Sequence, residues 1–204
     1  MHLNDHYWYF VSVLSNQFCD SVIKLANEKE KEIGTIGQQV NKKINKKELF
    51  KRRKSNIVWL EDKWIYKEIH PYIHLANKNA GWNFQWDFSE PCQFTIYNKD
   101  QHYDWHKDQH DFPMNNPNNK NVHGKIRKLS VTVSLSDPKD YKGGELQFDF
   151  RNSNDGKPVI KTATEILPRG SICVFPSFVW HRVTPVTKGT RNSLVIWNIG
   201  NPYI

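Results

Sequence analysis

The stretch HYDWHKDQHD, residues 102–111, gathers three histidines and three aspartates within ten positions. Imidazole nitrogens and carboxylate oxygens are common protein ligands of divalent transition metals. Two pairs have the form His-x-Asp, namely His102 with Asp104 and His106 with Asp108. Residues i and i+2 of a strand share a face, which lets an imidazole and a carboxylate at that spacing converge on one ion. The sequence therefore predicts a metal site in this stretch.

One metal ion cannot be bound by all the histidines and aspartates of this stretch. On a straight strand His102 and Asp108 would lie about 20 Å apart, so at most one pair, or His106 with a flanking aspartate, holds the ion. The next ligand must come from elsewhere, and His181 in PSFVWHRVTPV is the candidate. Two histidines and one carboxylate leave coordination positions open, which is the ligand set of non-haem Fe(II) oxygenases.

Arg191 follows His181 by ten residues in a second alternating segment, RNSLVIW. The alternation places Arg191, Ser193, Val195 and Trp197 on one face. An arginine on a strand beside the metal site can clamp a dicarboxylate by a bidentate pair. A structural salt bridge is the competing interpretation for this residue alone.

The elements that position these residues show period-two alternation from residue 93 onward. Eight strand-like runs, several separated by glycine or proline turns, cover residues 93–98, 103–108, 128–136, 144–150, 158–167, 171–176, 180–186 and 191–199. Short strands without intervening helices favour a cupin-like jelly roll, also called a double-stranded β-helix. Thr132 and Ser134 face the same way in the third run and line the pocket in this interpretation; in the alternative they only alternate with core residues.

The front of the chain has helical periodicity instead. Ser15 is a suitable N-cap for a helix with Phe18, Val22 and Ala26 on one face and Gly34 at its end. A second helical region covers residues 61–81, with Pro71 in the first turn of a new helix and Gly81 as its stop. We expect one domain over 1–204, in which residues 1–92 form a helical support and residues 93–204 form the catalytic core.

Two segments are left without a clear element. Residues 109–127, rich in Asn and Pro, are too long for a simple hairpin and are our candidate lid. Residues 41–56 hold much of the net charge of +8 and are either a phosphate-contacting patch or a solvated face.

The composition limits the class of protein. No apolar run reaches the roughly 20 residues of a membrane helix, and no signal peptide is evident. The three cysteines are widely spaced and contain no C-x-x-C pair. These features favour a reduced, cytoplasmic location without a membrane partner.

Three segments together carry a resemblance: YNKDQHYDWHKD, KLSVTVSLSDPKDYKGGELQF and LPRGSICVFPSFVWHRVTPVTKGTRNSLVIW. They resemble the Fe(II)/2-oxoglutarate dioxygenases, specifically the prolyl 4-hydroxylase-like branch and its bacterial and phage PKHD-type proteins. The likeness is close over about the last 115 residues and looser in the front, at RRKSNIVWL and the first helix.

The resemblance implies which histidine binds the metal. In that branch tyrosines stand three and nine residues before the first ligand, as Tyr103 and Tyr97 do before His106. The implied ligands of Fe(II) are therefore His106, Asp108 and His181.

The resemblance also implies the cosubstrate site and the reaction. Arg191 would bind the distal carboxylate of 2-oxoglutarate, with Tyr97 and Ser193 assisting it. 2-Oxoglutarate and dioxygen would be consumed, succinate and carbon dioxide released, and a C–H bond hydroxylated, with ascorbate as a possible reductant.

The prime substrate implied by the resemblance is a peptidyl proline in a peptide or protein. Tyr103, Trp105, Arg182 and Trp197 are the candidate contacts to it. A nucleic-acid base or nucleotide is the alternative within the superfamily, motivated by the basic charge. A non-catalytic binding module or a zinc hydrolase on a jelly roll is the alternative of another class.

Overall fold

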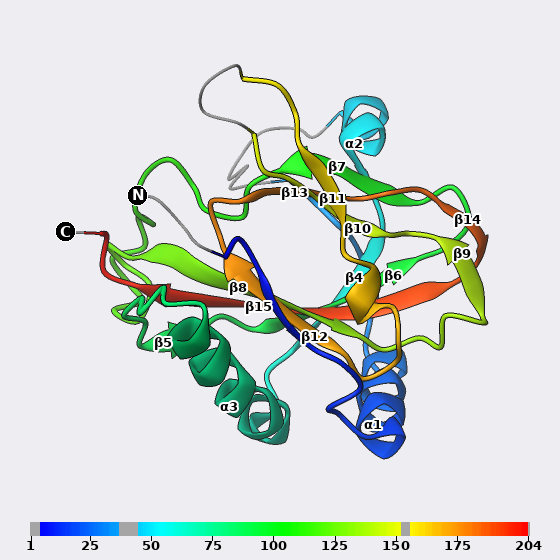
Figure 1. Cartoon of the computed structure of the whole chain (residues 1–204), viewed down its shortest axis with the longest axis horizontal. Coiled ribbons are helices and arrows are strands. Elements are labelled where there is room, and N and C mark those ends of the chain that lie inside the picture. The colour runs from blue at the N-terminus through cyan, green and yellow to red at the C-terminus, as the bar shows by residue number, and fades with distance from the viewer. Residues whose placement is uncertain (1–4, 37–44, 152–155, 204) are drawn as a thin grey trace.

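The computed structural model describes residues 5–36, 45–151 and 156–203. Two antiparallel sheets face each other in a jelly roll, and helices cover the outer side of the larger sheet (Figure 1). The predicted mainly β fold with N-terminal helices is therefore confirmed.

The sheets are built largely from the second half of the chain. The larger sheet has the order β1 (Trp8–Phe10), β12 (Ile172–Pro176), β8 (Ile126–Ser134), β15 (Arg191–Gly200), β6 (Cys92–Tyr97), β4 (Asn56–Leu60) and β2 (Glu32–Ile33), and β5 (Phe88–Ser89) also pairs with β15. The smaller sheet has the order β11 (Ile160–Thr162), β10 (Leu146–Asp149), β13 (Trp180–Val183), β7 (His102–His106) and β3 (Arg53–Lys54). A two-stranded pair joins β9 (Tyr141–Gly143) to β14 (Val186–Gly189).

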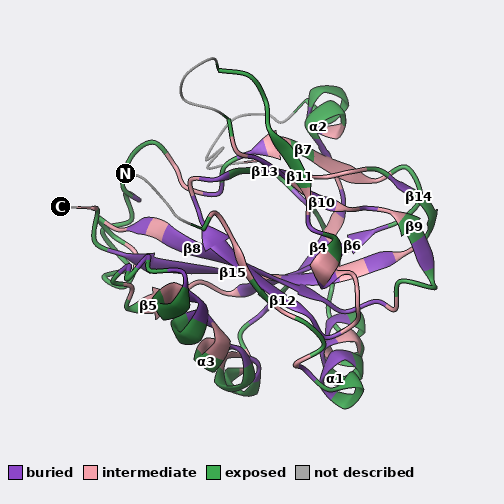
Figure 2. Cartoon of the chain, in the orientation of Figure 1, coloured by how far each residue is buried: buried purple, intermediate pink, exposed green. Residues whose placement is uncertain are grey.

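Two amphipathic helices cover the larger sheet. In α1 (Asn16–Asn27) the Ser15 hydroxyl accepts a hydrogen bond from the Phe18 amide, and the predicted face of Phe18, Val22 and Ala26 is buried. In α3 (Lys63–Asn79) the buried face consists of Ile65, Ile69, Ile73 and Ala76. These faces join the inner strands in one apolar core, whereas the opposite faces of both helices are exposed (Figure 2). The remaining helix, α2 (Lys46–Arg52), lies on the other side of the molecule beside β7 and β3 (Figure 1).

Several predicted boundaries in the front were wrong. The first helix ends at Asn27 rather than near Gly34, because residues 32–33 form a strand beside β4. Pro71 lies inside the continuous α3 with its side chain exposed, not in the first turn of a new helix. The buried apolar face on the opposite side outweighs the roughly 3 kcal/mol that an internal proline costs. Gly81, with φ of +68°, follows the helix as predicted.

Two of the predicted strand runs were also inaccurate. Residues 158–167 contain only the short β11 and then a 3-10 helix at Thr164–Ile166. Residues 180–186 belong to two strands, because the chain leaves β13 after Val183 and enters β14 at Val186. The predicted lid is mainly irregular and ends where β8 begins at Ile126. Within the described ranges, no helix is both long and apolar enough to cross a membrane.

Candidate metal centre

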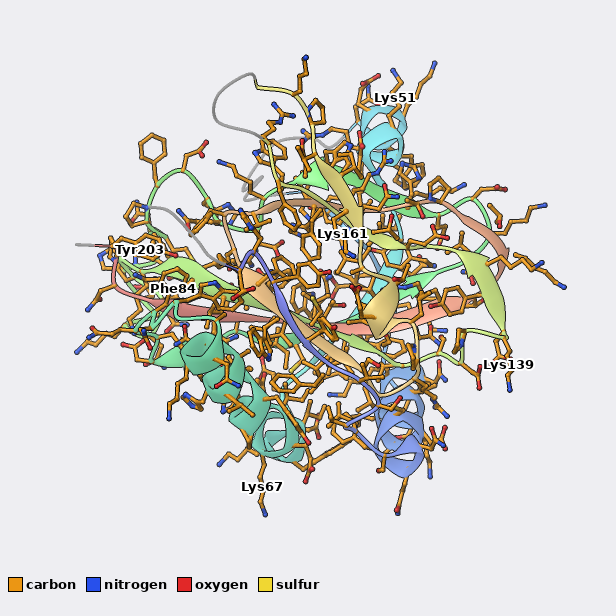
Figure 3. The ribbon with its side chains drawn as sticks, in the orientation of Figure 1. Lys51, Lys67, Phe84, Lys139, Lys161 and Tyr203 are labelled. Carbon is orange, nitrogen blue, oxygen red and sulfur yellow. The ribbon has the colours of Figure 1, made fainter. Side chains whose placement is uncertain are left out.

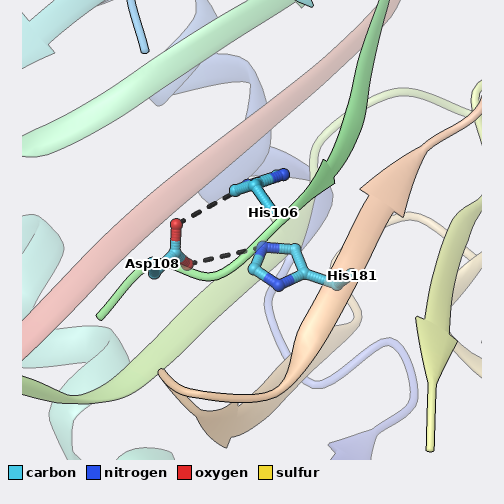
Figure 4. A group of neighbouring side chains, drawn as sticks. All are labelled: His106, Asp108 and His181. Atoms are coloured by element: carbon cyan, nitrogen blue, oxygen red, sulfur yellow. Dashed lines mark ion pairs between the residues drawn. The ribbon is translucent and has the colours of Figure 1, made fainter. Parts of the chain in front are cut away.

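Three buried side chains converge between the two sheets, as Figure 4 shows. His106 is the last residue of β7, Asp108 follows that strand, and His181 lies on the neighbouring β13, directly opposite His106 in the register. The Nε2 atoms of His106 and His181 lie 3.7 and 3.5 Å from the two carboxylate oxygens of Asp108. One potential ligand atom from each residue lies within 4.8 Å of the others. No second group of this kind occurs in the described part of the chain.

The backbone orients both imidazoles. The Nδ1 atom of His106 lies 2.7 Å from the Asp104 carbonyl oxygen, and that of His181 lies 2.9 Å from the Val179 carbonyl oxygen. A carbonyl only accepts, so each Nδ1 carries the proton and each Nε2 presents its lone pair to the centre. This is the tautomer that a metal ion requires.

The charges of the cluster also suit a cation. Burial alone would raise the pKa of the Asp108 carboxyl, but the neighbouring His181 and His106 lower it to about 2. Burial and the nearby His181 lower the pKa of His106 to about 3. At neutral pH the site therefore offers a carboxylate and a neutral His106, the protonation states in which these groups bind metals.

The structure distinguishes among the histidines of the opening stretch. His102, at the start of β7, contacts the Lys51 carbonyl oxygen through Nε2 at 3.1 Å. Asp104 is exposed and takes part in the centre only through its backbone carbonyl. The set brought together is thus His106, Asp108 and His181, two nitrogens and a carboxylate, which fits Fe(II) with positions left open.

An inner cavity opens beside the three ligands and extends along β15. Arg191, Ser193, Val195 and Trp197 all line it, which confirms the alternation predicted for RNSLVIW. Tyr97 lies opposite Arg191 in the register, and the Arg191 guanidinium carbon is 5.7 Å from the centre of the Tyr97 ring.

The guanidinium of Arg191 is buried without a carboxylate. Its side chain is 5% exposed, and its Nη1 donates to the Ser193 hydroxyl at 3.2 Å. None of the ion pairs found among the described residues includes Arg191. A buried cation of this kind is a ready site for an anionic group, and a dicarboxylate that also reaches the metal fits it.

The two predicted pocket residues of β8 are placed differently. Thr132 lines the inner cavity. Ser134 is buried but does not line it, and its hydroxyl donates to the Ile166 carbonyl oxygen at 2.6 Å. The position of Ser134 therefore indicates a structural role at the far end of the strand.

A wider outer cleft leads from the metal ligands to the surface. Tyr103 and Trp197 line both the cleft and the inner cavity. The Tyr103 ring stacks on His106 with centroids 3.5 Å apart, and the Arg127 guanidinium lies 3.8 Å from the centre of the Trp197 ring. These two aromatic side chains line the passage from the surface to the metal ligands.

Trp105 and Arg182, also predicted to contact substrate, lie elsewhere. They alternate with His106 and His181 on their strands and line neither the cleft nor the inner cavity. The Arg182 guanidinium stacks on the Trp105 ring at 4.7 Å and donates to Gln147 at 2.8 Å. The structure thus pairs these two residues with each other, away from the metal.

Sequence analysis missed two arginines of the cleft. Arg53 is 4% exposed and lies 4.5 Å from the centre of the Tyr103 ring. Its Nη2 atom is buried without a hydrogen-bond partner among the described residues. Arg127 forms a bidentate ion pair with Glu90, at 2.6 and 3.1 Å. The segment RRKSNIVWL was a usable signal, since the loose resemblance already included it.

Comparison with known proteins agrees with this geometry. The profile of the 2OG-Fe(II) oxygenase superfamily matches residues 92–198. A PKHD-type hydroxylase of Pseudoalteromonas atlantica is 37% identical over 108 residues, which are 52% of this chain and 42% of that protein. A PKHD-type hydroxylase of Hyphomonas neptunium is 45% identical over 69 residues, 34% of this chain and 27% of that protein. The matches thus span less than half the length of these relatives.

Solved structures support the fold over nearly the whole chain. A viral collagen prolyl hydroxylase from Paramecium Bursaria Chlorella virus-1, solved with 2-oxoglutarate, has a TM-score of 0.64 at 18% identity and 97% coverage of both chains. A Trichoplax adhaerens prolyl hydroxylase in complex with a hypoxia inducible factor peptide fragment has a TM-score of 0.67 at 18% identity, covering 96% of this chain and 84% of the other. Because the superfamily profile covers more than half of the chain and its metal ligands are assembled as described, this protein belongs to the 2OG-Fe(II) oxygenase superfamily.

Proposed function

We propose that this protein is an Fe(II)- and 2-oxoglutarate-dependent dioxygenase that hydroxylates a proline residue of a polypeptide. The observation that carries the proposal is the juxtaposition of a buried His-Asp-His cluster with a buried, carboxylate-free arginine in one cavity. The first fits the metal and the second fits the far end of the cosubstrate. Neither a binding module nor a zinc hydrolase has a use for both.

The three ligands act as a fixed frame. Each histidine donates a hydrogen bond from Nδ1–H to a backbone carbonyl oxygen, which leaves the Nε2 lone pair directed at the site of the ion. Asp108 is held as a carboxylate by its surroundings. Bound Fe(II), with 2-oxoglutarate and dioxygen, supplies the oxidation of a C–H bond to an alcohol as the cosubstrate becomes succinate and carbon dioxide.

Arg191 positions the cosubstrate. Its guanidinium would donate to the distal carboxylate of 2-oxoglutarate in the inner cavity, which Arg191 lines together with the metal ligands. Ser193 already accepts from Nη1, which fixes the plane of the guanidinium. Tyr97 and Thr132 line the same cavity and would add polar groups to the site of the carboxylate.

The outer cleft suits a proline within a polypeptide. Tyr103 and Trp197 line the cleft beside the metal ligands and would offer apolar ring edges to a pyrrolidine ring, since His106 and Arg53 lie against the Tyr103 ring and Arg127 lies against the Trp197 ring. Arg53, whose guanidinium carbon lies 4.5 Å from the centre of the Tyr103 ring, adds a positive charge to the wall of the cleft. Two of the structural neighbours named above are prolyl hydroxylases, one of them complexed with a peptide, which supports the same substrate class.

The first experiment measures succinate release. The protein is loaded anaerobically with Fe(II) and 2-oxoglutarate, exposed to oxygen, and assayed with and without proline peptides. We expect oxygen-dependent succinate, stimulated by peptide, and its loss in Asp108→Ala. Asp104→Ala is the matched control, because this exposed aspartate contributes only its backbone to the site.

Two results would contradict the proposal. If the anaerobic protein shows no metal-to-ligand absorption band with 2-oxoglutarate, the metal and cosubstrate assignments are wrong. If the band forms but a broad set of proline peptides is never hydroxylated, the dioxygenase class stands and the polypeptide substrate is rejected.

A further inference from the structure

Cations are concentrated on one rim of the outer cleft. Helix α2 exposes Lys46, Lys47, Lys51 and Arg52, and Arg52 also lines the cleft. The only acidic residue of the helix, Glu48, pairs with Lys51 at 2.8 Å. The helix packs beside β7 and β3, and Lys51 projects outward from it in Figure 3. The rim therefore presents an excess of positive charge next to the entrance.

The stability of α2 does not explain all of these cations. Lys51 and Arg52 lie in its last turn, where positive charge interacts favourably with the helix macrodipole. Lys46 and Lys47 lie in its first turn, where the same dipole disfavours them. Lys46 and Lys47 therefore lower the stability of the helix where they stand. A role in binding an anionic partner would account for their presence there.

A second group of cations surrounds an exposed tryptophan of the cleft. The Lys107 ammonium and the Arg151 guanidinium carbon lie 5.8 and 6.0 Å from the ring centre of Trp180, which is 39% exposed. Arg151 is already paired with the buried Asp149 at 2.9 Å, so Lys107 is the exchangeable cation of this group. Lys107 pairs with Asp111 at 3.3 Å, but that aspartate is 80% exposed, so the pair contributes little and Lys107 can change partner.

No acidic side chain among the described residues that line the cleft is free. Glu90 is held by Arg127, Asp111 by Lys107, and Asp108 belongs to the metal centre. Deeper in the cleft, Arg53 is buried with one unpartnered nitrogen. Among the described residues that line the cleft, Arg52 therefore has no acidic partner and Arg53 keeps one unpartnered nitrogen; Asp111, which is 80% exposed, would return to solvent if Lys107 changed partner.

The two groups of cations lie at opposite ends of β7. The α2 end is fixed by β3, whose Arg53 and Lys54 pair with Tyr103 and His102. Lys107 lies at the other end, directly after His106. A bound chain that crosses the metal would therefore meet cations both before and after its target residue.

We propose that the polypeptide substrate is acidic, with carboxylate side chains on both sides of the target proline that bind the α2 rim and Lys107. This inference rests on the proposed function and specifies its substrate class. A polypeptide can carry a neutral target between charged flanks, as this arrangement requires.

The test uses three fluorescent 13-residue peptides with a central proline, each flanked on both sides by two Asp, two Asn or two Lys. Binding is measured by anisotropy without oxygen, on protein loaded with Fe(II) and 2-oxoglutarate. We expect the Asp peptide to bind at least tenfold more tightly than the Asn peptide at about 25 mM salt. The difference should shrink to about twofold near 500 mM, where charges a few ångströms apart are screened.

Charge reversal identifies the responsible surface. The triple variant Lys46→Glu, Lys47→Glu, Lys107→Glu should prefer the Lys peptide. The matched control is Lys67→Glu with Lys139→Glu, two exposed lysines that lie far from α2 (Figure 3); it should keep the preference for the Asp peptide. The same order of preference is expected for kcat/KM of hydroxylation.

The outcomes separate this inference from the proposed function. Equal binding and equal hydroxylation of the three peptides would overturn the acidic preference and leave proline hydroxylation intact. A single-stranded oligonucleotide that binds more tightly than the Asp peptide and is itself oxidised, with no peptide hydroxylated, would overturn both.

Discussion

Arg191→Met tests whether the guanidinium in the inner cavity is kept there for an anion. Among the described residues, this buried cation has one hydrogen bond, to Ser193, and no ion pair. Methionine has a similar length and no charge, so it can fill the space without the desolvation penalty. The substitution should therefore affect the free protein and the complex in opposite directions.

The magnitudes follow from the two environments. A hydrogen bond to a charged group contributes roughly 1.5–3 kcal/mol, so losing the clamp should raise the Kd for 2-oxoglutarate about 10- to 150-fold. Replacing a buried charge with an apolar side chain is often neutral or stabilising by about 1–4 kcal/mol. We expect the free energy of unfolding of the metal-free variant to rise by about 1–2 kcal/mol, because the relief is offset by the lost contact with Ser193.

Two measurements on the same samples check this. Urea unfolding of the metal-free protein gives the stability, and anaerobic titration of the metal-to-ligand absorption band gives the affinity for 2-oxoglutarate. Arg182→Met is the matched control, since Arg182 is hydrogen-bonded to Gln147 and stacked on Trp105 outside both cavities. Its affinity for 2-oxoglutarate should be unchanged.

The reasoning is refuted if Arg191→Met binds 2-oxoglutarate as tightly as the original protein. It is also refuted if the variant loses more than about 2 kcal/mol of stability while Arg182→Met does not, because Arg191 would then stabilise the fold rather than await a ligand.

Three further predictions concern the same region. Because the pKa of His106 is lowered to about 3, below its ordinary 6.5, the unfolded chain binds a proton that the folded one excludes. The metal-free protein should therefore lose roughly 2–3 kcal/mol between pH 6.5 and pH 4.5, and urea unfolding of His106→Gln should show a flatter pH profile. Gly144→Ala should lose about 1–3 kcal/mol of stability, because φ is +70° and a Cβ would lie 2.9 Å from Arg191 Cδ. If Arg191 binds the cosubstrate as proposed, this variant should also bind 2-oxoglutarate more weakly. Gly124→Ala, at φ +75° in open space, should lose less stability and keep the affinity. Ser134→Ala should lower Tm without changing the KM for 2-oxoglutarate, because its hydroxyl bonds the Ile166 carbonyl oxygen. Thr132→Val should raise that KM without lowering Tm, because Thr132 lines the inner cavity. If both variants change Tm and KM equally, the two positions are not functionally distinct.

The strands of the core and the order of the site residues could be predicted because their signals are local. Alternation at RNSLVIW correctly placed four side chains in one cavity, and the spacing of two tyrosines before His106 separated it from His102. The first argument needs only the alternation of a strand, whereas the second rests on the resemblance to the prolyl 4-hydroxylase-like branch, in which tyrosines stand at those two positions.

The parts that could not be predicted depend on contacts between distant segments. Glu32–Ile33 is a strand only because β4 lies beside it, and its two residues have no periodicity of their own. Arg53 lies in a run of basic residues, and only its pairing with Tyr103 on β7 buries it in the cleft. Trp105 is aromatic and close to the ligands in sequence, but it packs against Arg182 and lines neither the cleft nor the inner cavity, whereas Tyr103, two residues earlier, lines both.

The carbonyl groups that orient the two metal-binding imidazoles belong to residues 104 and 179, each two positions before its histidine. The orienting group is thus part of the main chain of the same segment, and it is present whatever side chain stands at those positions. Side chains around the outer cleft can therefore be exchanged without removing the acceptors that aim the ligands. This separation gives protein engineers a practical route: the residues that select a substrate can be redesigned on this scaffold while the iron site is left as it is.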